Sequence, residues 1–275
     1  MYKTLINCQV LCKHLNHHSW VIVDCRYDLM NKQSGRNQYL IAHIPGAVYA
    51  NLHTDLSGPP VTDCGRHPLP APQAMQALFI GLGISQDIQV VVYDNAGGSF
   101  AARLWWMLRF MGHEAVAVLD GGWPVWQQRG LPTASGEEIN GPGNFHGQSR
   151  REWLVTVDKV TAAVLLVDSR DPVRYRGEAE PVDKVAGHIP GAINHFWKDN
   201  LDSNGLFKDP DMLRKEFLDF LGDTTAGDAV FYCGSGVTAC HNLLAAAHAG
   251  LPAPQLYAGS WSEWCSDANR PVATG

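Results

Sequence analysis

The chain has 275 residues, of which 45% are hydrophobic and 17% are charged, and its formal net charge is −6. This composition is typical of a folded globular protein, and the length allows two domains. The negative charge, without a block of lysine and arginine, argues against nucleic acid and anionic membranes as partners. No apolar run approaches the ~20 residues that span a bilayer, and the first ten residues lack the apolar core of an export signal, so we expect a cytoplasmic protein.

The first half of the chain alternates between short apolar segments and segments of helical composition. In chain order we expect a helix near the N-terminus, a strand at 21–26, a turn and short strand at 42–48, a proline-rich excursion at 59–72, a helix at 73–82, a strand at 88–93, a loop at 94–99, a helix at 100–111, a strand at 115–119 and a short helix from 121. Alternation of this kind predicts a mostly parallel sheet with helices on both faces.

The second half repeats landmarks of the first half in the same order, at an offset of about 140 residues. The repeated landmarks are Asp24-x-Arg26 and Asp168-x-Arg170, the two His-Ile-Pro-Gly-Ala elements that begin at His43 and His188, the strand ends at Tyr93 and Tyr232, and the tryptophan pairs Trp123/Trp126 and Trp261/Trp264. We therefore predict tandem α/β domains at 1–134 and 151–275, joined by a linker at 135–150 that is rich in glycine and polar residues. The Asp-Arg pairs are interpreted as scaffold ion pairs and the tryptophans as core.

The most informative stretch is the loop that begins at Cys233. An apolar strand is expected at 229–232, and an alanine- and leucine-rich helix follows at 242–249. Gly234 and Gly236 leave the backbone free to curl around the cysteine, so that N–H groups of residues 234–238 converge on the sulfur. A thiol in such surroundings has a lowered pKa and is largely thiolate at neutral pH. The position that corresponds to Cys233 in the first half is Asp94, which predicts one catalytic copy and one that kept only the scaffold.

Seven cysteines spread over the chain predict a reducing compartment rather than a disulfide framework. Cys8 and Cys12 have no second pair at zinc-site spacing, and the histidines are scattered. We expect no metal site and no cofactor.

These features together resemble the two-domain rhodanese-type sulfurtransferases, and the resemblance covers nearly the whole chain. It implies that Cys233 accepts sulfur as a persulfide and passes it to cyanide, a small thiol or thioredoxin. The loop from Cys233 to Thr238 is similar to that of members that use 3-mercaptopyruvate, whereas thiosulfate-specific members tend to carry basic residues where Gly234 and Ser235 stand. Thiosulfate remains the alternative donor.

The resemblance also implies roles for individual residues. Gly234, Gly236, Val237 and Thr238 would form the loop that binds the transferred sulfur. Arg174 would hold the carboxylate of the donor, since a guanidinium suits bidentate contact with a carboxylate. Animal mercaptopyruvate enzymes often carry a second arginine shortly afterwards, but Val182 stands there in this chain. Arg176 could replace it or could be an ordinary exposed loop residue.

Proton transfer is the least determined part of the sequence prediction. The resemblance suggests Ser235 with His43, and with Asp28 as a candidate acid. Ser235 could equally be a small loop-forming residue. His43 could instead cap its turn, as we expect of His188, because the same motif occurs in both halves.

Two other classes of protein place a cysteine in such a loop. Phosphatases and arsenate reductases need an arginine six residues after the cysteine, and Ala239 stands there. A non-enzymatic redox sensor would pair Cys233 with Cys240, about two helical turns away, and would need rearrangement to do so.

Overall fold

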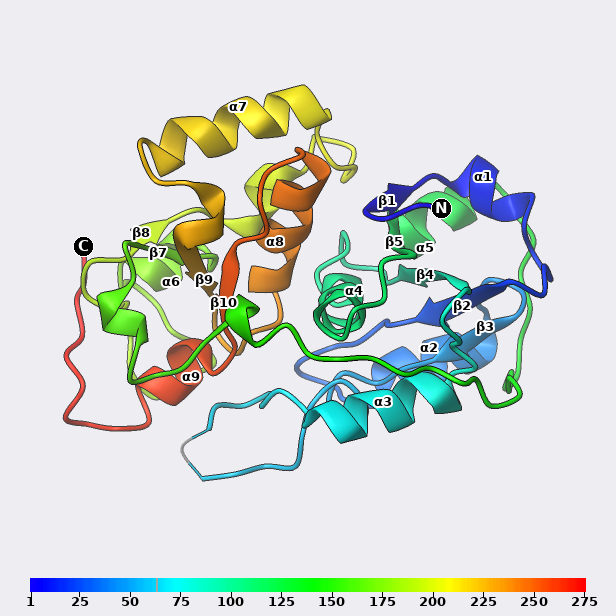
Figure 1. Ribbon diagram of the computed structural model, residues 1–275, viewed down its shortest axis with the longest axis horizontal. Helices are drawn as coiled ribbons and strands as arrows, with labels where there is room; N and C mark the ends of the chain where they lie inside the picture. The colour runs from blue at the N-terminus through cyan, green and yellow to red at the C-terminus, as the bar shows by residue number, and fades with distance from the viewer. Residues whose placement is uncertain (63) are drawn as a thin grey trace. The chain divides into compact units, whose positions relative to one another are not determined.

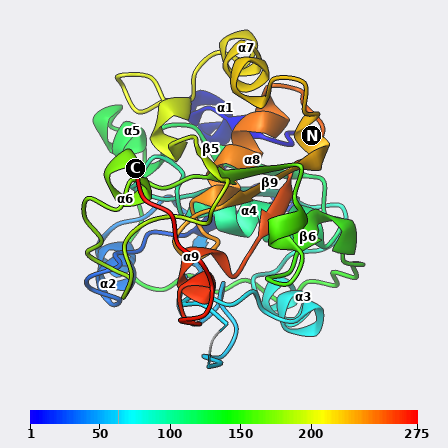
Figure 2. The same cartoon turned by 90° about the vertical axis from the view of Figure 1, so that its left-hand side faces the viewer.

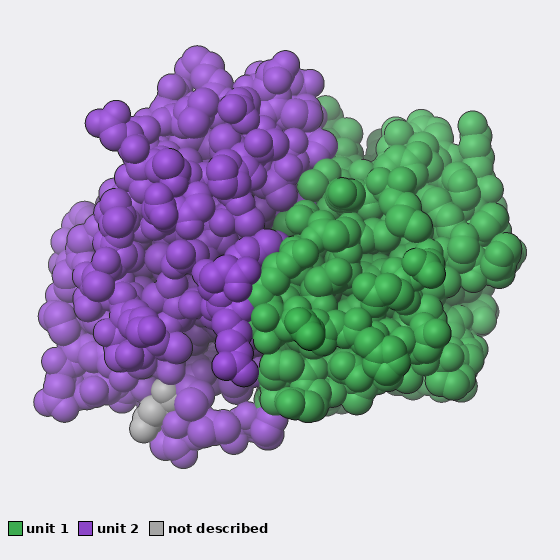
Figure 3. All heavy atoms as spheres, viewed as in Figure 1, with its two compact units in different colours: residues 1–58, 70–150, 203–206 green, residues 59–69, 151–202, 207–275 purple. Residues whose placement is uncertain are grey.

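A computed structural model describes residues 1–62 and 64–275, which form two compact units. Unit 1 comprises residues 1–58, 70–150 and 203–206, and unit 2 comprises residues 59–69, 151–202 and 207–275 (Figure 3). Residues 59–69 thus pack with the C-terminal half, although the sequence divides the halves near residue 134. Residues 135–150 pack with unit 1, where the N–H groups of Gly143 and Arg150 donate to the carbonyls of Ile80 and Phe110.

Unit 1 is built on a parallel sheet of five strands in the order β1-β5-β4-β2-β3 (Figure 1). Its elements are β1 (Leu5–Ile6), α1 (Cys8–Cys12), β2 (Trp20–Asp24), α2 (Ser34–Ile41), β3 (Ala47–Tyr49), α3 (Pro72–Gly81), β4 (Gln89–Tyr93), α4 (Ala101–Phe110), β5 (Val116–Leu119) and α5 (Gly122–Gln128). The central strand β4 is buried along its whole length, as its run of valines predicts.

Unit 2 has the same topology, with strand order β6-β10-β9-β7-β8. Its elements are η1 (Arg151–Trp153), β6 (Leu154–Val155), η2 (Val160–Ala162), β7 (Leu165–Asp168), α6 (Pro172–Tyr175), β8 (Ile193–Asn194), η3 (Trp197–Asn200), α7 (Pro210–Leu221), η4 (Ala226–Asp228), β9 (Ala229–Tyr232), α8 (Ala239–His248), β10 (Gln255–Tyr257) and α9 (Ser260–Trp264). Helix α8 packs against both α7 and β9 (Figure 2).

The equivalent strand orders confirm the predicted fold class of two tandem α/β domains. The predicted strands and helices of the first half are found within a few residues of their expected ends. The two-residue edge strands β1 and β6 escaped prediction, because an alternating or apolar pattern cannot be recognised over so short a segment.

Buried ion pairs support each sheet at equivalent places. Arg26 donates to Asp24 at 2.6 Å and Arg170 donates to Asp168 at 2.6 Å, and all four side chains are almost fully buried. Each guanidinium also lies over a tryptophan ring of its own unit, at 4.5 Å from the centroid of Trp123 in unit 1. The predicted scaffold role of these pairs is confirmed, and Trp123, Trp126, Trp261 and Trp264 are all core residues as predicted.

Over the described ranges of the chain, no helix is both long enough and apolar enough to cross a membrane. Within the same ranges, no group of three or more histidine, cysteine, aspartate or glutamate side chains is arranged to hold a metal ion.

Candidate active site

Cys233 lies where strand β9 ends, at the carboxyl edge of the unit 2 sheet, and helix α8 begins six residues later. Gly236, between them, has a φ of +73°, a conformation that glycine adopts readily. A Cβ at this position would lie 2.2 Å from the carbonyl oxygen of Ala258. The loop can therefore turn this tightly only with glycine at residue 236.

The start of helix α9 holds the first part of this loop in place. The N–H groups of Trp261 and Ser262 donate to the carbonyls of Cys233 and Gly234, at 3.0 and 2.9 Å. The N–H of Cys233 donates to the Ser260 hydroxyl at 3.1 Å. These hydrogen bonds fix the backbone of residues 233 and 234 and thereby the position of the Cys233 side chain.

The sulfur of Cys233 is buried and surrounded by hydrogen-bond donors. Burial alone would raise the pKa of this thiol. The Thr238 hydroxyl and the backbone N–H groups of Ser235, Ala239 and Val237 outweigh that effect, and the pKa of Cys233 lies below its usual value. The site therefore favours a sulfur anion. For the buried thiol of Cys25 in unit 1, burial and then the nearby negative charges of Asp24 and Asp94 raise the pKa well above its usual value.

Ser235 is hydrogen-bonded to a histidine that the sequence did not indicate. The Nδ1 atom of His67 lies 2.8 Å from the Ser235 hydroxyl, and both side chains are buried. His67 belongs to residues 59–69, the part of the N-terminal half that packs with unit 2. Ser235 stands two residues after Cys233, so the structure brings a serine-histidine pair to the cysteine loop.

The prediction that His43 partners Ser235 is therefore corrected. His43 lies in unit 1, where its Nδ1 is 2.8 Å from the carbonyl of Tyr39 and its ring stacks on the Tyr39 ring. His188 makes the same two contacts with Tyr175 in unit 2. The duplicated geometry identifies both histidines as turn-capping residues. Asp28 is exposed and accepts N–H groups of its own turn, at Met30 and Asn31, so it is equally structural.

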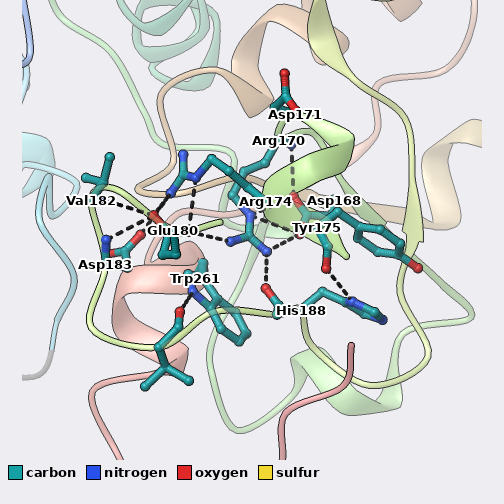
Figure 4. Close-up of polar contacts among 12 residues, drawn as sticks. Asp168, Arg170, Asp171, Arg174, Tyr175, Glu180, Val182, Asp183, His188 and Trp261 are labelled. Carbon is teal, nitrogen blue, oxygen red and sulfur yellow. Dashed lines mark hydrogen bonds and ion pairs between the residues drawn. The ribbon is translucent and has the colours of Figure 1, made fainter. Parts of the chain in front are cut away.

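Arg174 lies in the short helix α6, and its side chain is bonded to two carboxylates (Figure 4). Its guanidinium donates to Glu180 at 2.8 and 3.0 Å and to Asp183 at 3.1 Å. Glu180 also accepts from Arg170 at 3.2 Å. This network fixes a guanidinium 3.5 Å from the place where a Cβ on Gly234 would be. The guanidinium of Arg174 thus lies beside the cysteine loop, and its predicted role in substrate binding stays a prediction.

A second arginine, Arg66, also reaches this loop. Its Nη2 lies 3.0 Å from the Cβ position of Gly234, and its Nη1 is paired with Asp183. Arg66 and His67 are adjacent in sequence, so one short segment supplies two side chains to the site. Arg176, the alternative considered from the sequence, is exposed and bonded to Glu178 at 2.6 Å.

Cys240 lies in the first turn of α8, where its thiol donates to the Gly236 carbonyl at 3.4 Å. It therefore braces the loop from the helix side. Neither it nor Cys233 is in a disulfide.

Comparison with known proteins agrees with this geometry. The rhodanese-like domain family matches residues 8–129 and 155–267. The chain is 45% identical to a probable 3-mercaptopyruvate sulfurtransferase of Pseudomonas aeruginosa, over 98% of each chain. It is 40% identical to the putative thiosulfate sulfurtransferase SseB of Mycobacterium tuberculosis, over 92% of this chain and 90% of that one.

A solved structure shares the fold. The 3-mercaptopyruvate sulfurtransferase of Leishmania major superposes with a TM-score of 0.88 at 30% identity, covering 98% of this chain and 76% of that one. Two matched rhodanese-like domains, relatives similar over nearly the full length and a solved structure with the same fold lead to one conclusion. The chain belongs to the rhodanese family of sulfurtransferases, as a protein with two rhodanese-like domains in tandem.

Proposed function

We propose that this protein transfers a sulfur atom from 3-mercaptopyruvate to a thiophilic acceptor through a persulfide on Cys233. The observation that carries the proposal is the lowered pKa of a fully buried thiol, produced by backbone N–H groups and one hydroxyl that converge on the sulfur. The same donors would stabilise the negative charge of a persulfide.

In the first step, the Cys233 thiolate attacks the sulfur of 3-mercaptopyruvate. A sulfur–sulfur bond forms and the carbon–sulfur bond of the donor breaks, and its electron pair leaves on carbon as the enolate of pyruvate. The proton of the donor thiol must then reach that carbon. The products are pyruvate and Cys233 persulfide, so the charge and atoms of the two reactants are conserved.

Ser235 and His67 would carry this proton. The hydroxyl and the imidazole are 2.8 Å apart, the separation of a direct hydrogen bond. Histidine accepts and releases protons near neutral pH, and serine can pass a proton between donor and imidazole. Arg174 would hold the donor carboxylate, because its guanidinium is fixed by Glu180 and faces the loop.

In the second step, a nucleophile attacks the outer sulfur of the persulfide and restores the Cys233 thiolate. A small thiol or thioredoxin would leave as a persulfide, and cyanide as thiocyanate. Storing the sulfur covalently divides one transfer into two, which predicts ping-pong kinetics. The covalent intermediate forms on Cys233, and the proposed steps call for neither a metal nor an organic cofactor. The seven cysteines, which form no disulfide among the residues that the structure describes, support a reducing, cytoplasmic location.

Thiosulfate is the second candidate donor, because a relative bearing that name is 40% identical. The loop favours mercaptopyruvate: Gly234 and Ser235 contribute no charge, and the hydroxyl of Ser235 is bonded to a proton acceptor. Transfer from thiosulfate releases sulfite and protonates no carbon atom. The Ser235–His67 pair would therefore have no role in that reaction.

The donor can be identified by intact mass spectrometry after incubation with each compound. We expect the protein to gain one sulfur atom, faster from 3-mercaptopyruvate than from thiosulfate, and Cys233→Ser to gain none. Cys265→Ser, at a half-buried cysteine of the same unit, is the matched control and should behave like the parent. If neither donor adds sulfur to the parent protein, the proposed function is wrong.

A further inference from the structure

Helix α8 begins directly after the Cys233 loop, so the position of its start decides where the donors to the sulfur lie. The N–H groups of Val237 and Ala239 and the hydroxyl of Thr238 belong to the first residue of this helix or to the two residues before it. On the other side of the loop, strand β9 ends at Tyr232. These donors therefore stay directed at the sulfur only if α8 and β9 keep a constant relative position.

Ser169 is bonded to both sides of this loop. It follows β7, and its N–H donates to the carbonyl of Tyr232, the residue before Cys233, at 2.8 Å. Its hydroxyl accepts a side-chain N–H of Asn242, which lies in α8, at 3.0 Å. Ser169 and Asn242 are both fully buried. Ser169 thus links the strand before the loop to the helix after it.

The amide group of Asn242 is hydrogen-bonded at every position. Its N–H groups donate to the Ser169 hydroxyl and, at 3.0 Å, to the carbonyl of His195, and its oxygen accepts from Asn200 at 2.6 Å. A carbonyl can only accept, so the bond to His195 fixes which way the amide points. Asn200 is fully buried and lies in η3, which packs against α8. A buried polar network in which every bond is made holds its members in one arrangement.

Unit 1 lacks the side-chain link between these two positions. The fourth residue of α4 is Leu104, whereas the fourth residue of α8 is Asn242. Cys25 stands where unit 2 has Ser169, and its N–H likewise donates to the carbonyl of the last strand residue, at 2.7 Å. A leucine side chain has no group that could bond to residue 25. The loop of unit 1 is instead held by Asp94, whose carboxylate accepts four backbone N–H groups.

We propose that Asn242 is a positioning residue, which together with Ser169 holds the start of α8 against the end of β9 and so keeps the donors of the loop directed at the Cys233 sulfur. Sulfur is a weaker hydrogen-bond acceptor than a carboxylate, so this loop needs a link that the loop of unit 1 does not. The inference rests on the proposed function, in which the Cys233 thiolate is the nucleophile. It can be tested without sulfur transfer.

The test measures how fast iodoacetamide alkylates Cys233 in the folded protein at a series of pH values, with the modified residue assigned by peptide mass mapping. Asn242→Leu introduces the residue of unit 1, which is similar in size. Donors that are less well placed stabilise the thiolate less, so less of the reactive form is present at neutral pH. The rate at pH 7 should fall about three- to tenfold, the factor expected for loss of a hydrogen bond. At high pH, where both proteins are thiolate, the rates should converge.

Leu244→Ala, two residues further along α8, is the matched control. It removes a fully buried side chain and leaves a cavity, so the variant should unfold at a lower urea concentration than the parent. The bonds of Asn242 are left in place, and the alkylation rates should follow those of the parent at every pH. An effect of Asn242→Leu that came only from a less stable helix would appear in Leu244→Ala as well.

Ser169→Ala tests the other half of the link, because it removes the hydroxyl and keeps the N–H that donates to Tyr232. The rate at pH 7 should fall in the same direction but by less, since Asn242 retains its bonds to His195 and Asn200. The double variant Ser169→Ala/Asn242→Leu should react no more slowly than Asn242→Leu alone, as expected for two residues that act through one hydrogen bond.

The outcomes distinguish this inference from the proposed function. Alkylation rates of Asn242→Leu that match the parent, or that Leu244→Ala reproduces, overturn the positioning role even if sulfur is transferred normally. A parent protein that takes no sulfur from either donor, but in which alkylation of Cys233 depends on Asn242 as described, supports the positioning role and refutes the proposed function.

Discussion

The two units place an anion in the same position of the same fold, but by different means. In unit 1 the Asp94 carboxylate follows β4 and accepts four backbone N–H groups at 2.8–2.9 Å, from Ala96, Gly98, Phe100 and Ala101. In unit 2 the sulfur of Cys233 follows β9 and is surrounded by three N–H groups and one hydroxyl.

The supports behind the two loops also match. The N–H of Trp123 donates to the Asp94 carbonyl at 2.8 Å, just as the N–H of Trp261 donates to that of Cys233 at 3.0 Å. The residues before these tryptophans, Gly122 and Ser260, both have a positive φ, at +54° and +57°. The fold therefore makes an anion-binding loop in both units, regardless of which anion occupies it.

The proposed function assigns the catalytic role to the loop of unit 2. In unit 1 both oxygens of Asp94 accept backbone N–H groups, and a carboxylate is not a sulfur nucleophile. Unit 2 places the thiol of Cys233, the proposed nucleophile, in the loop and adds side chains beside it: the Ser235–His67 pair, Arg174 and Arg66. Substitutions can test each of these differences between the two units.

The largest effect is expected when the proton path is removed. Ser235→Ala should lower kcat with 3-mercaptopyruvate by about 10²- to 10⁴-fold, the usual contribution of general acid–base catalysis. The rate with thiosulfate should change far less, because sulfite leaves without a proton on carbon. Steady-state kinetics with both donors measures the split.

His67→Gln should reproduce this donor-dependent loss, since it removes the imidazole that contacts Ser235. Ser266→Ala, at an exposed serine of the same unit, is the matched control and should leave both rates unchanged. Equal losses with both donors would mean that Ser235 only shapes the loop and carries no proton.

A smaller effect is expected when the anion of unit 1 is removed. Asp94→Ala leaves four N–H groups without their acceptor, and since each buried unsatisfied donor costs about 1–3 kcal/mol, we expect the free energy of unfolding to fall by at least ~3 kcal/mol. The amides of residues 96–101 should also exchange faster with deuterium. Asp28→Ala removes an exposed carboxylate that accepts two N–H groups, and it should cost about 1 kcal/mol or less. If both variants lose equally little stability, Asp94 is not the anion that the loop requires.

Most of the fold could be predicted from the sequence, because its signals are local or repeated. The duplication is indicated by the repeated strand ends at Tyr93 and Tyr232 and by the two Asp-x-Arg pairs. The anion-binding loop is indicated by the glycines around Cys233. His67 and Arg66 could not be found in this way. They lie in a proline-rich segment without periodicity, more than 160 residues before Ser235, and only the packing of residues 59–69 on unit 2 brings them to the site.

The partner of Ser235 could not be found for a related reason. His43 belongs to a conspicuous repeated motif, whereas His67 stands in no motif at all. The repetition already favours a turn-capping role for His43, since only one half has the cysteine, but it gives no other histidine to put in its place. The valine at residue 182 likewise left only Arg176 as a candidate second arginine, because no local signal in the sequence points to Arg66.

The smallest effect is expected at Thr238. Its hydroxyl donates to the sulfur of Cys233, whereas Asp94 accepts from backbone N–H groups. The Thr238 hydroxyl is the strongest of the groups that lower the pKa of Cys233. Thr238→Val replaces the hydroxyl by a methyl group of similar size and removes a hydrogen bond to the sulfur anion, so the pKa of Cys233 should rise. Because the thiolate is the reactive form and is lost as the pH falls, the variant should need a higher pH than the parent for the same rate of alkylation by iodoacetamide. Thr238→Ser keeps the hydroxyl and should follow the parent profile. An unchanged pH dependence of alkylation in Thr238→Val would show that backbone N–H groups alone stabilise the sulfur anion, as they bind the carboxylate of Asp94. The two loops would then differ only in the anionic group that their N–H groups bind.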